Sequence, residues 1–306
     1  MFARKRQPET DWYWAASPED RKEYDAFGPW VDAVRSAADM PPCFRAAYGQ
    51  HRDARFLLKV PIAADRQEVR PGMNLYRQVL AVHDDRIAVL WVEGGTIVTR
   101  TISWSDIAAI RSATNLLRAN WTLLLGNGET IAVDYNAVST RRLDAVTEFV
   151  RERLVPDAER PNAGDASSVA VADYFFQSML FAVRNSLPRQ VTPLHFEPRD
   201  RLCRDWHNRP GLSTGLMILD AGDELIVVDR GAAVRRVFHP TYAAGLTYMP
   251  YRRLTGFALL PPPAGRGRFR TLRLVLDRLT IDRPCLVAPD RVVAHLAARG
   301  VPQAAG

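Results

Sequence analysis

Five basic side chains lie close together in the second half of the chain, and their chemistry suits an anion. They are Arg199, Arg201, Arg204, His207 and Arg209. Guanidinium groups bind phosphate and carboxylate through paired, charge-assisted hydrogen bonds. These residues therefore make a candidate loop for binding an anion or an acidic partner. Two carboxylates interrupt the run, and the arginine-rich composition favours the plainer alternative of a solvated loop.

The other residues that could do chemistry lack the neighbours that the chemistry requires. Cys203 and His207 are spaced like two ligands on one helical face, but no second pair follows, and structural zinc takes four ligands. His83 precedes Asp84 and Asp85 at the end of an expected strand, where adjacent side chains point in different directions. The six histidines are scattered along the sequence. We expect no enzyme, no metal site and no cofactor.

The composition is that of an ordinary globular protein of two domains. The chain has 306 residues, of which 47% are hydrophobic and 25% charged. No apolar run approaches the roughly 20 residues that cross a bilayer, and charge at Met1 to Arg6 is followed by polar residues rather than by the apolar core of a secretion signal. Three widely spaced cysteines are typical of reduced thiols. We therefore expect a cytoplasmic protein.

The net charge of +7 does not by itself indicate nucleic acid. The arginines alternate with acids, as they do on solvated helix faces, and form no stripe with interleaved aromatic residues. The N-terminal segment combines Arg4-Lys5-Arg6 with Trp12-Tyr13-Trp14, which could favour a membrane interface. We expect instead that these aromatic residues cover the edge of a core.

Alternating apolar residues predict a series of hairpins in the first half. Residues 80–82 and 87–91 alternate on either side of a turn at Asp84-Asp85. A second hairpin is expected around residues 126–128, where two glycines supply the positive φ of a tight turn. An amphipathic helix should follow and place one apolar stripe on the sheet. Its stripe consists of Leu143, Val146, Val150 and Leu154.

The second half repeats this order. Tyr251, Leu254 and Phe257 have the spacing of Trp104, Ile107 and Ile110, displaced by 147 residues. A hairpin is expected around Ala221-Gly222-Asp223, and a final helix after Pro289 that ends at Gly300. A further helix is expected within 172–187, with its apolar stripe in the core. The stripe consists of Phe176, Met179, Leu180, Val183 and Leu187.

The run from Leu80 to Leu154, with Trp104-Ser105-Asp106-Ile107 in its middle, resembles the bacterial pleckstrin-homology-like (PH-like) domains. The resemblance implies an α+β fold of two modules, each a bent antiparallel sheet or open barrel capped by a C-terminal helix. It also implies that the basic loop after the first strand of a module could meet an anionic headgroup. The expected parts are an N-terminal arm of poor order (1–19), module 1 (20–155), a linker (156–168), module 2 with a leading helix (169–300) and a tail (301–306).

These patterns together predict a non-enzymatic binding or scaffold protein. A protein or peptide partner is expected, recognised through sheet edges and the grooves beside the helices. One alternative is a peripheral module for anionic lipid or phosphate headgroups, and a second is an enzyme whose site assembles only in space. Homo-oligomerisation stays open.

Overall fold

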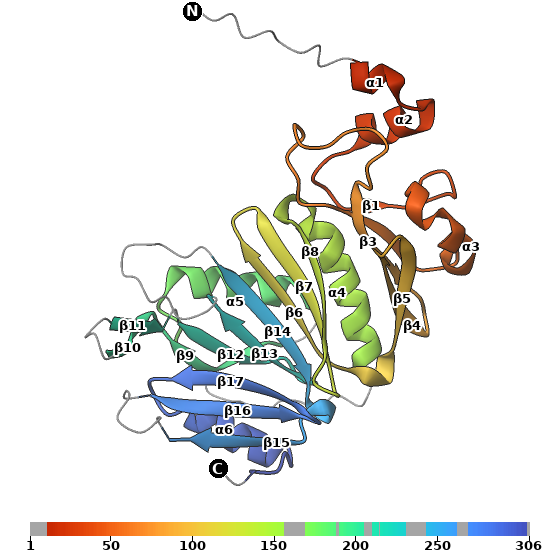
Figure 1. The fold of residues 1–306 in the computed structure, drawn as a ribbon. Helices are drawn as coiled ribbons and strands as arrows, with labels where there is room; N and C mark the ends of the chain where they lie inside the picture. Colours follow the sequence, from red (N-terminus) through yellow and green to blue (C-terminus); the bar gives the residue numbers. More distant parts are fainter. Residues whose placement is uncertain are drawn as a thin grey trace, which may run out of the picture. The chain divides into compact units, whose positions relative to one another are not determined.

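Figure 1 shows the fold in a computed structural model, which describes residues 11–155, 169–187, 190–204, 210–213, 215–230, 243–261 and 269–304. Over these residues the chain is an α+β protein with mostly antiparallel sheets, as expected. None of the described helices combines the length and the apolar character needed to cross a membrane. The chain divides into two compact units, Met1–Trp104 with Val133–Val146, and Ser105–Ala132 with Thr147–Gly306.

Unit 1 is built on a five-stranded sheet with short helices before and within it. The strands follow the order β1-β2-β3-β4-β5. They are β1 (Asp32–Ala33), β2 (Phe56–Pro61), β3 (Tyr76–Val82), β4 (Arg86–Glu93) and β5 (Thr96–Ser103). The helices are α1 (Asp11–Ala15), α2 (Pro18–Ala26), the 3-10 helix η1 (Pro42–Ala47) and α3 (Tyr48–His51).

The predicted hairpins of this sheet are confirmed. The strands β3 and β4 pair antiparallel on either side of Asp84-Asp85, and β4 continues into β5 through Gly94 and Gly95, both with positive φ. The core of the unit contains residues of the sheet and of η1, which lies between β1 and β2. Phe44 of η1 is fully buried and packs with apolar residues such as Val79 and Leu90.

Unit 2 contains most of a seven-stranded sheet in the order β8-β7-β6-β14-β13-β12-β9. Its strands are β6 (Ile107–Asn115), β7 (Arg118–Leu125), β8 (Thr130–Asn136), β9 (Thr192–Glu197), β12 (Leu216–Asp220), β13 (Glu224–Asp229) and β14 (Ala244–Pro250). A three-stranded sheet is formed by β15 (Gly256–Leu260), β16 (Arg270–Leu276) and β17 (Leu279–Cys285). The strands β10 (Asp200–Arg204) and β11 (Pro210–Ser213) pair with each other. The division between the units falls inside β8.

The predicted helices are present. They are α4 (Thr140–Leu154), α5 (Tyr174–Ser186) and α6 (Asp290–Ala298). All four residues of the α4 stripe are buried, and Trp121 on β7 donates a hydrogen bond to Thr147 on α4 (2.9 Å). Val292 and Leu296 of α6 pack in one core with residues of β13 and β16. In α5 the side chains of Phe176, Leu180 and Val183 are buried, as expected of a helix with one apolar stripe.

The two halves of the chain have the same order of elements. Four strands, a 3-10 turn, three strands and a helix occur as β2–β5, η2 (Trp104–Asp106), β6–β8 and α4, and again as β9 with β12–β14, η4 (Tyr251–Arg253), β15–β17 and α6. The two 3-10 turns are displaced by the predicted 147 residues. The strands β10 and β11 are inserted into the second series only.

The expected arrangement of one bent sheet or open barrel for each half is not confirmed, and the sheets are not closed barrels. Instead, β6 of the first half pairs with β14 of the second, with Thr247 opposite Arg111, so strands of both halves share one open sheet. The physical reason is that an edge strand exposes unpaired backbone groups, and pairing two edges satisfies both rows at once. A hydrophobic pattern specifies which face of a strand is buried but not which strand pairs with its edge.

Two terminal segments also differ from expectation. Residues 11–19, expected to belong to an arm of poor order, form α1 and the start of α2. Residues 302–304, expected in a tail, bond to β15: Phe257 N donates to Pro302 O (3.0 Å), and Ala304 N donates to Phe257 O (2.7 Å). The pairing satisfies the edge of the three-stranded sheet. The expected linker, 156–168, lies outside the described residues.

Candidate functional site

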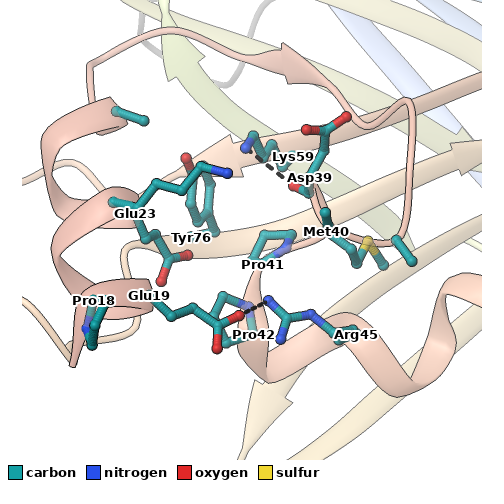
Figure 2. A pocket seen from close by; sticks show the side chains of 14 residues that line it. Pro18, Glu19, Glu23, Asp39, Met40, Pro41, Pro42, Arg45, Lys59 and Tyr76 are labelled. Carbon is teal, nitrogen blue, oxygen red and sulfur yellow. Dashed lines mark hydrogen bonds and ion pairs between the residues drawn. The ribbon is translucent and has the colours of Figure 1, made fainter.

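A pocket of about 590 Å³ opens in unit 1 beside α2 (Figure 2). Its volume lies in the range of ordinary ligand sites. Three parts of the unit form it: α2, the segment that leads into η1 together with η1 itself, and the strands β2 and β3. The charged residues on its wall are Glu19, Lys22, Glu23, Asp39, Arg45 and Lys59. The uncharged ones are Pro18, Ala26, Ala37, Ala38, Met40, Pro41, Pro42 and Tyr76.

Two sets of contacts hold α2, which contributes one wall of the pocket. Ser17 is the N-cap: its Oγ accepts from Asp20 N (3.1 Å) and donates to the Asp20 carboxylate (2.7 Å), and Pro18 follows in the first turn. Later in the helix, the Arg66 guanidinium lies 3.8 Å from the centre of the Tyr24 ring and donates to the Tyr24 carbonyl. The cap and this stacking hold α2 in place, so that Glu19 and Glu23, four residues apart, reach the same pocket.

Glu23 is an acid of the pocket whose protonation state changes near neutral pH. Burial raises its pKa from 4.5 to about 7, while Lys59 acts in the opposite direction. Its carboxylate forms neither a hydrogen bond nor an ion pair with the residues that the structure describes. Figure 2 shows the side chain extending from α2 toward the pocket. At neutral pH this group is therefore divided between its protonated and ionised forms.

Lys59 supplies a cation on β2. Its Nζ donates to the carbonyl oxygen of Asp39 (3.1 Å) and lies 4.9 Å from the centre of the Tyr76 ring. Within the described part of the chain, Lys59 forms no ion pair with a carboxylate. An ammonium group has three N–H donors, so the carbonyl and the ring leave donors for a ligand.

Four other polar groups at this pocket are engaged or unreactive, whereas the charged Lys22 also lines its wall. Arg45 and Glu19 form an ion pair (2.6 Å). Cys43, next to Pro42, donates to the side-chain oxygen of Asn74 (3.2 Å), and burial raises the pKa of its thiol to about 11. Burial also raises the pKa of Tyr76 to about 12. Neither group is an ionised nucleophile near pH 7, so the arrangement is suited to binding through apolar contact and charges of both signs.

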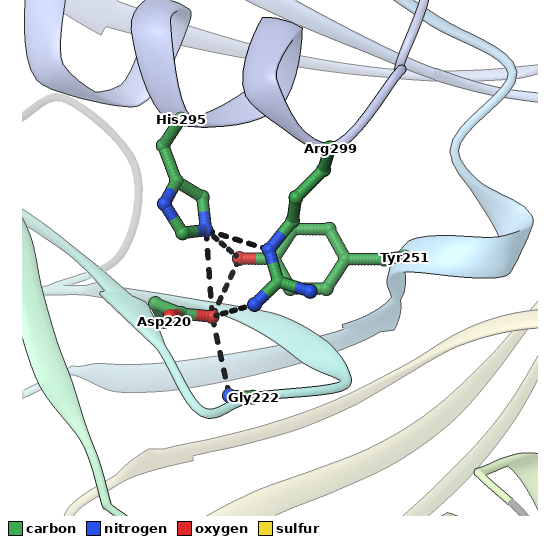
Figure 3. A network of polar contacts seen from close by, with 5 residues as sticks. All are labelled: Asp220, Gly222, Tyr251, His295 and Arg299. Carbon is green, nitrogen blue, oxygen red and sulfur yellow. Dashed lines mark hydrogen bonds and ion pairs between the residues drawn. The ribbon is translucent and has the colours of Figure 1, made fainter. Parts of the chain in front are cut away.

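A second polar cluster, in unit 2, joins Asp220, Tyr251, His295 and Arg299 (Figure 3). One oxygen of Asp220 accepts from Tyr251 Oη (2.9 Å), Gly222 N (3.1 Å) and Arg299 Nη2 (3.3 Å). Arg299 Nε donates to His295 Nε2 (2.8 Å), and this nitrogen also lies 3.1 Å from Tyr251 Oη. We call these four residues the Asp220 network.

The charges and hydrogen bonds of the Asp220 network stabilise the fold by connecting separate elements. Burial works to raise the pKa of Asp220, but the hydrogen bonds around it and the charge of Arg299 outweigh burial and lower it. Burial raises the pKa of Tyr251 well above 10. The acid is thus ionised and the phenol protonated at neutral pH. Each group is engaged by another member of the network, which connects the turn after β12 to η4 and to the end of α6.

Three possible metal ligands, His195, Glu197 and Cys285, meet in unit 2 with their donor atoms within 4.8 Å of one another. All three residues are buried. The Glu197 carboxylate, however, already accepts from the backbone N–H groups of Leu286 and Val287 (2.9 and 2.8 Å) and lies 3.0 Å from His195 Nε2. Burial raises the pKa of the Cys285 thiol to about 12. This set of contacts ties the end of β17 to β9 and leaves the carboxylate engaged without an ion.

The four histidines in the described part of the chain each meet another titratable side chain, in contrast to the sequence interpretation. His51 and His83 touch in unit 1, with Nδ1 and Nε2 3.0 Å apart, and burial lowers the pKa of both. His195 meets Glu197, and His295 meets Asp220. His51 and His83 lie 32 positions apart, and Asp220 and His295 lie 75 apart, so residue spacing gave no signal of these two pairs, whereas His195 and Glu197 are two positions apart on β9.

The predicted basic loop is in part a strand. Arg199 is exposed just before β10, while Arg201 and Arg204 belong to β10 and stand opposite Leu212 and Pro210 of β11. His207 and Arg209 lie outside the described residues. The anion-binding role of these five residues stays a prediction, as does the pairing of Cys203 with His207.

The pocket residues were not singled out from the sequence. Glu23 and Lys59 stand 36 positions apart, and neither has a chemical partner at a recognisable spacing. The available signal was the pair Pro41-Pro42, which marks a boundary between elements. It indicates a loop wall but not the charges that the loop faces.

The chain matches no model in a scan of protein families, and a search of curated proteins returns no match either. The function is therefore argued from the site itself.

Proposed function

We propose that this protein is a non-enzymatic binding protein that recognises a protein or peptide partner, and that the partner inserts a short segment into the pocket of unit 1. The observation that carries the proposal is the pocket itself, a volume of about 590 Å³ whose apolar wall also holds Glu23 and Lys59 without an ion-pair partner among the described residues. Peptides offer this combination of apolar side chains, backbone carbonyls and charge.

The proposal includes two PH-like modules, one for each half of the chain. The repeated order of four strands, a 3-10 turn, three strands and a helix supports it. The positions of the helices also support it. The helix α4 is hydrogen-bonded to β7, and α6 shares a core with β16. The strands β7 and β16 hold corresponding positions in the two series. Modules of this kind are scaffolds on which binding sites differ, so the pocket rather than the fold indicates the partner.

The test is selection of peptides by the full-length chain. The immobilised protein is exposed to a displayed library of random peptides at pH 7, and enriched sequences are synthesised and titrated. Lys59→Gln should weaken binding of an enriched peptide about tenfold, because a charge-assisted hydrogen bond contributes about 1.5–3 kcal/mol. Arg55→Gln is the matched control, since Arg55 is exposed and lies outside the pocket wall.

Two results would overturn the proposal: no peptide enriched over a blank surface, or equal affinities for the Lys59 and Arg55 variants. Vesicles containing phosphatidylserine provide the competing outcome. If the chain sediments with them and Arg199→Glu abolishes sedimentation, the anionic-lipid alternative replaces the peptide proposal.

A further inference from the structure

We infer that the pocket takes a segment carrying a basic group, a lysine or arginine side chain or a peptide amino terminus, and that this group is placed against Glu23. The inference rests on the proposed function and narrows it to a class of ligand. Its basis is geometric: Glu23 extends into an open pocket, and its carboxylate has no partner among the described residues (Figure 2).

The other acids of this pocket are already engaged. Glu19 is paired with Arg45. A carboxylate oxygen of Asp39 accepts from Arg35 N (3.2 Å). Asp20, which is not part of the pocket wall, accepts from the Ser17 hydroxyl that caps α2. Glu23 is thus the carboxylate on this wall that makes no hydrogen bond or ion pair with the described residues.

The charges that face Glu23 come from three elements. Lys59 on β2 and Arg45 on η1 favour its ionised form, while Glu19 and Asp20 on α2 disfavour it. Cys43 and Tyr76 also lie within its field and are protonated near neutral pH. Because burial outweighs the two cations, Glu23 keeps a proton to about pH 7. A ligand cation would supply the missing countercharge and displace that proton.

The consequence is a binding reaction linked to proton release. A cation that requires ionised Glu23 binds better as pH rises through the pKa of that group. With a pKa of about 7 in the free protein, affinity should rise about tenfold between pH 6 and pH 8. An anionic ligand held by Lys59 would show the opposite trend, because ionised Glu23 would repel it.

The experiment uses the full-length chain and three capped peptides, acetyl-Ala-Ala-Xaa-Ala-Ala-amide, in which Xaa is lysine, norleucine or glutamate. Carbon-13 labelling of glutamate side chains lets the Glu23 carboxyl be followed by NMR, with Glu23→Gln to assign it. We expect the free carboxyl to titrate near pH 7 and the lysine peptide to lower that midpoint. We also expect affinity for this peptide to rise about tenfold from pH 6 to pH 8, and this rise to be absent in Glu23→Gln.

The matched control is Glu93→Gln, which removes an exposed carboxylate of unit 1 outside the pocket and should leave the pH profile unchanged. Equal or tighter binding of the norleucine or glutamate peptide overturns the inference while leaving a peptide site in place. If none of the three peptides binds but library selection yields a binder, the inference is again wrong and the proposed function stands. Failure of the library selection itself overturns the proposed function.

Discussion

The pocket of unit 1 and the Asp220 network of unit 2 hold similar kinds of side chain but use them differently. In the network, one oxygen of Asp220 accepts three hydrogen bonds, and Arg299 also bonds to His295. In the pocket, Glu23 and Lys59 face an open volume, and neither has an ion-pair partner among the described residues. A carboxylate that is fully engaged keeps its charge and stabilises the fold, whereas one that is half-buried and unpaired keeps its proton and is available to a ligand.

The pKa values of the two acids record this difference. Asp220 is the more buried, with 3% of its surface exposed, yet its pKa is lowered, because its hydrogen bonds and the charge of Arg299 outweigh burial. Glu23 is only half-buried, yet its pKa rises to about 7 because burial is not compensated. Partners rather than depth decide which acid is ionised at neutral pH.

Breaking the Asp220 network should have the largest effect. Asp220→Ala should lower the free energy of unfolding by about 3 kcal/mol, because it leaves the buried groups of Tyr251 and Arg299 without their acceptor. Urea unfolding at pH 7 measures it. Since the pKa of Asp220 is lowered in the folded state, its stabilisation is present above the usual range for aspartate and is lost as pH falls through the lowered value. A difference below 1 kcal/mol at pH 7 would show that the network is not a structural tie.

Removing the charge of Glu23 should have a smaller effect of the opposite sign. The raised pKa means that the folded state holds its proton more tightly than the unfolded state does, so ionisation costs stability as pH rises from about 4.5 to about 7. Glu23→Gln should therefore match the parent at pH 4 and be more stable at pH 8, by on the order of 1 kcal/mol after allowing for solvent screening. Thermal unfolding at both pH values measures it, with Glu93→Gln as control. Lower stability of the Glu23 variant at pH 8 would contradict the uncompensated burial.

An exposed ion pair provides a contrast to the buried Asp220 network. Arg273 and Asp282 form two hydrogen bonds of 2.8 Å across neighbouring strands, but both side chains are exposed. Asp282→Asn should change the free energy of unfolding by less than about 1 kcal/mol, and the change should shrink further in 1 M salt. An effect as large as that of Asp220→Ala would mean that burial does not separate the two acids.

The sequence alone was sufficient for the local structure. Alternating residues around Asp84-Asp85 predicted a hairpin that the structure contains, and the stripe from Leu143 to Leu154 predicted α4. The shared spacing of Trp104 and Tyr251 predicted a repeated order of elements, and a 3-10 turn is found at both places. Each of these features depends on neighbours within one or two turns of chain, so period and turn chemistry specify it.

Only the tertiary structure decided which strands share a sheet and which charges meet. The pairing of β6 with β14 depends on backbone edges, which every residue type offers alike. Glu23 and Lys59 share one pocket, and Asp220 lies beside His295, because of where α2 and α6 lie on their sheets. Side-chain types limit what a residue can do, but burial and the identity of its partners are properties of the packed chain, and these set the charge of each acid.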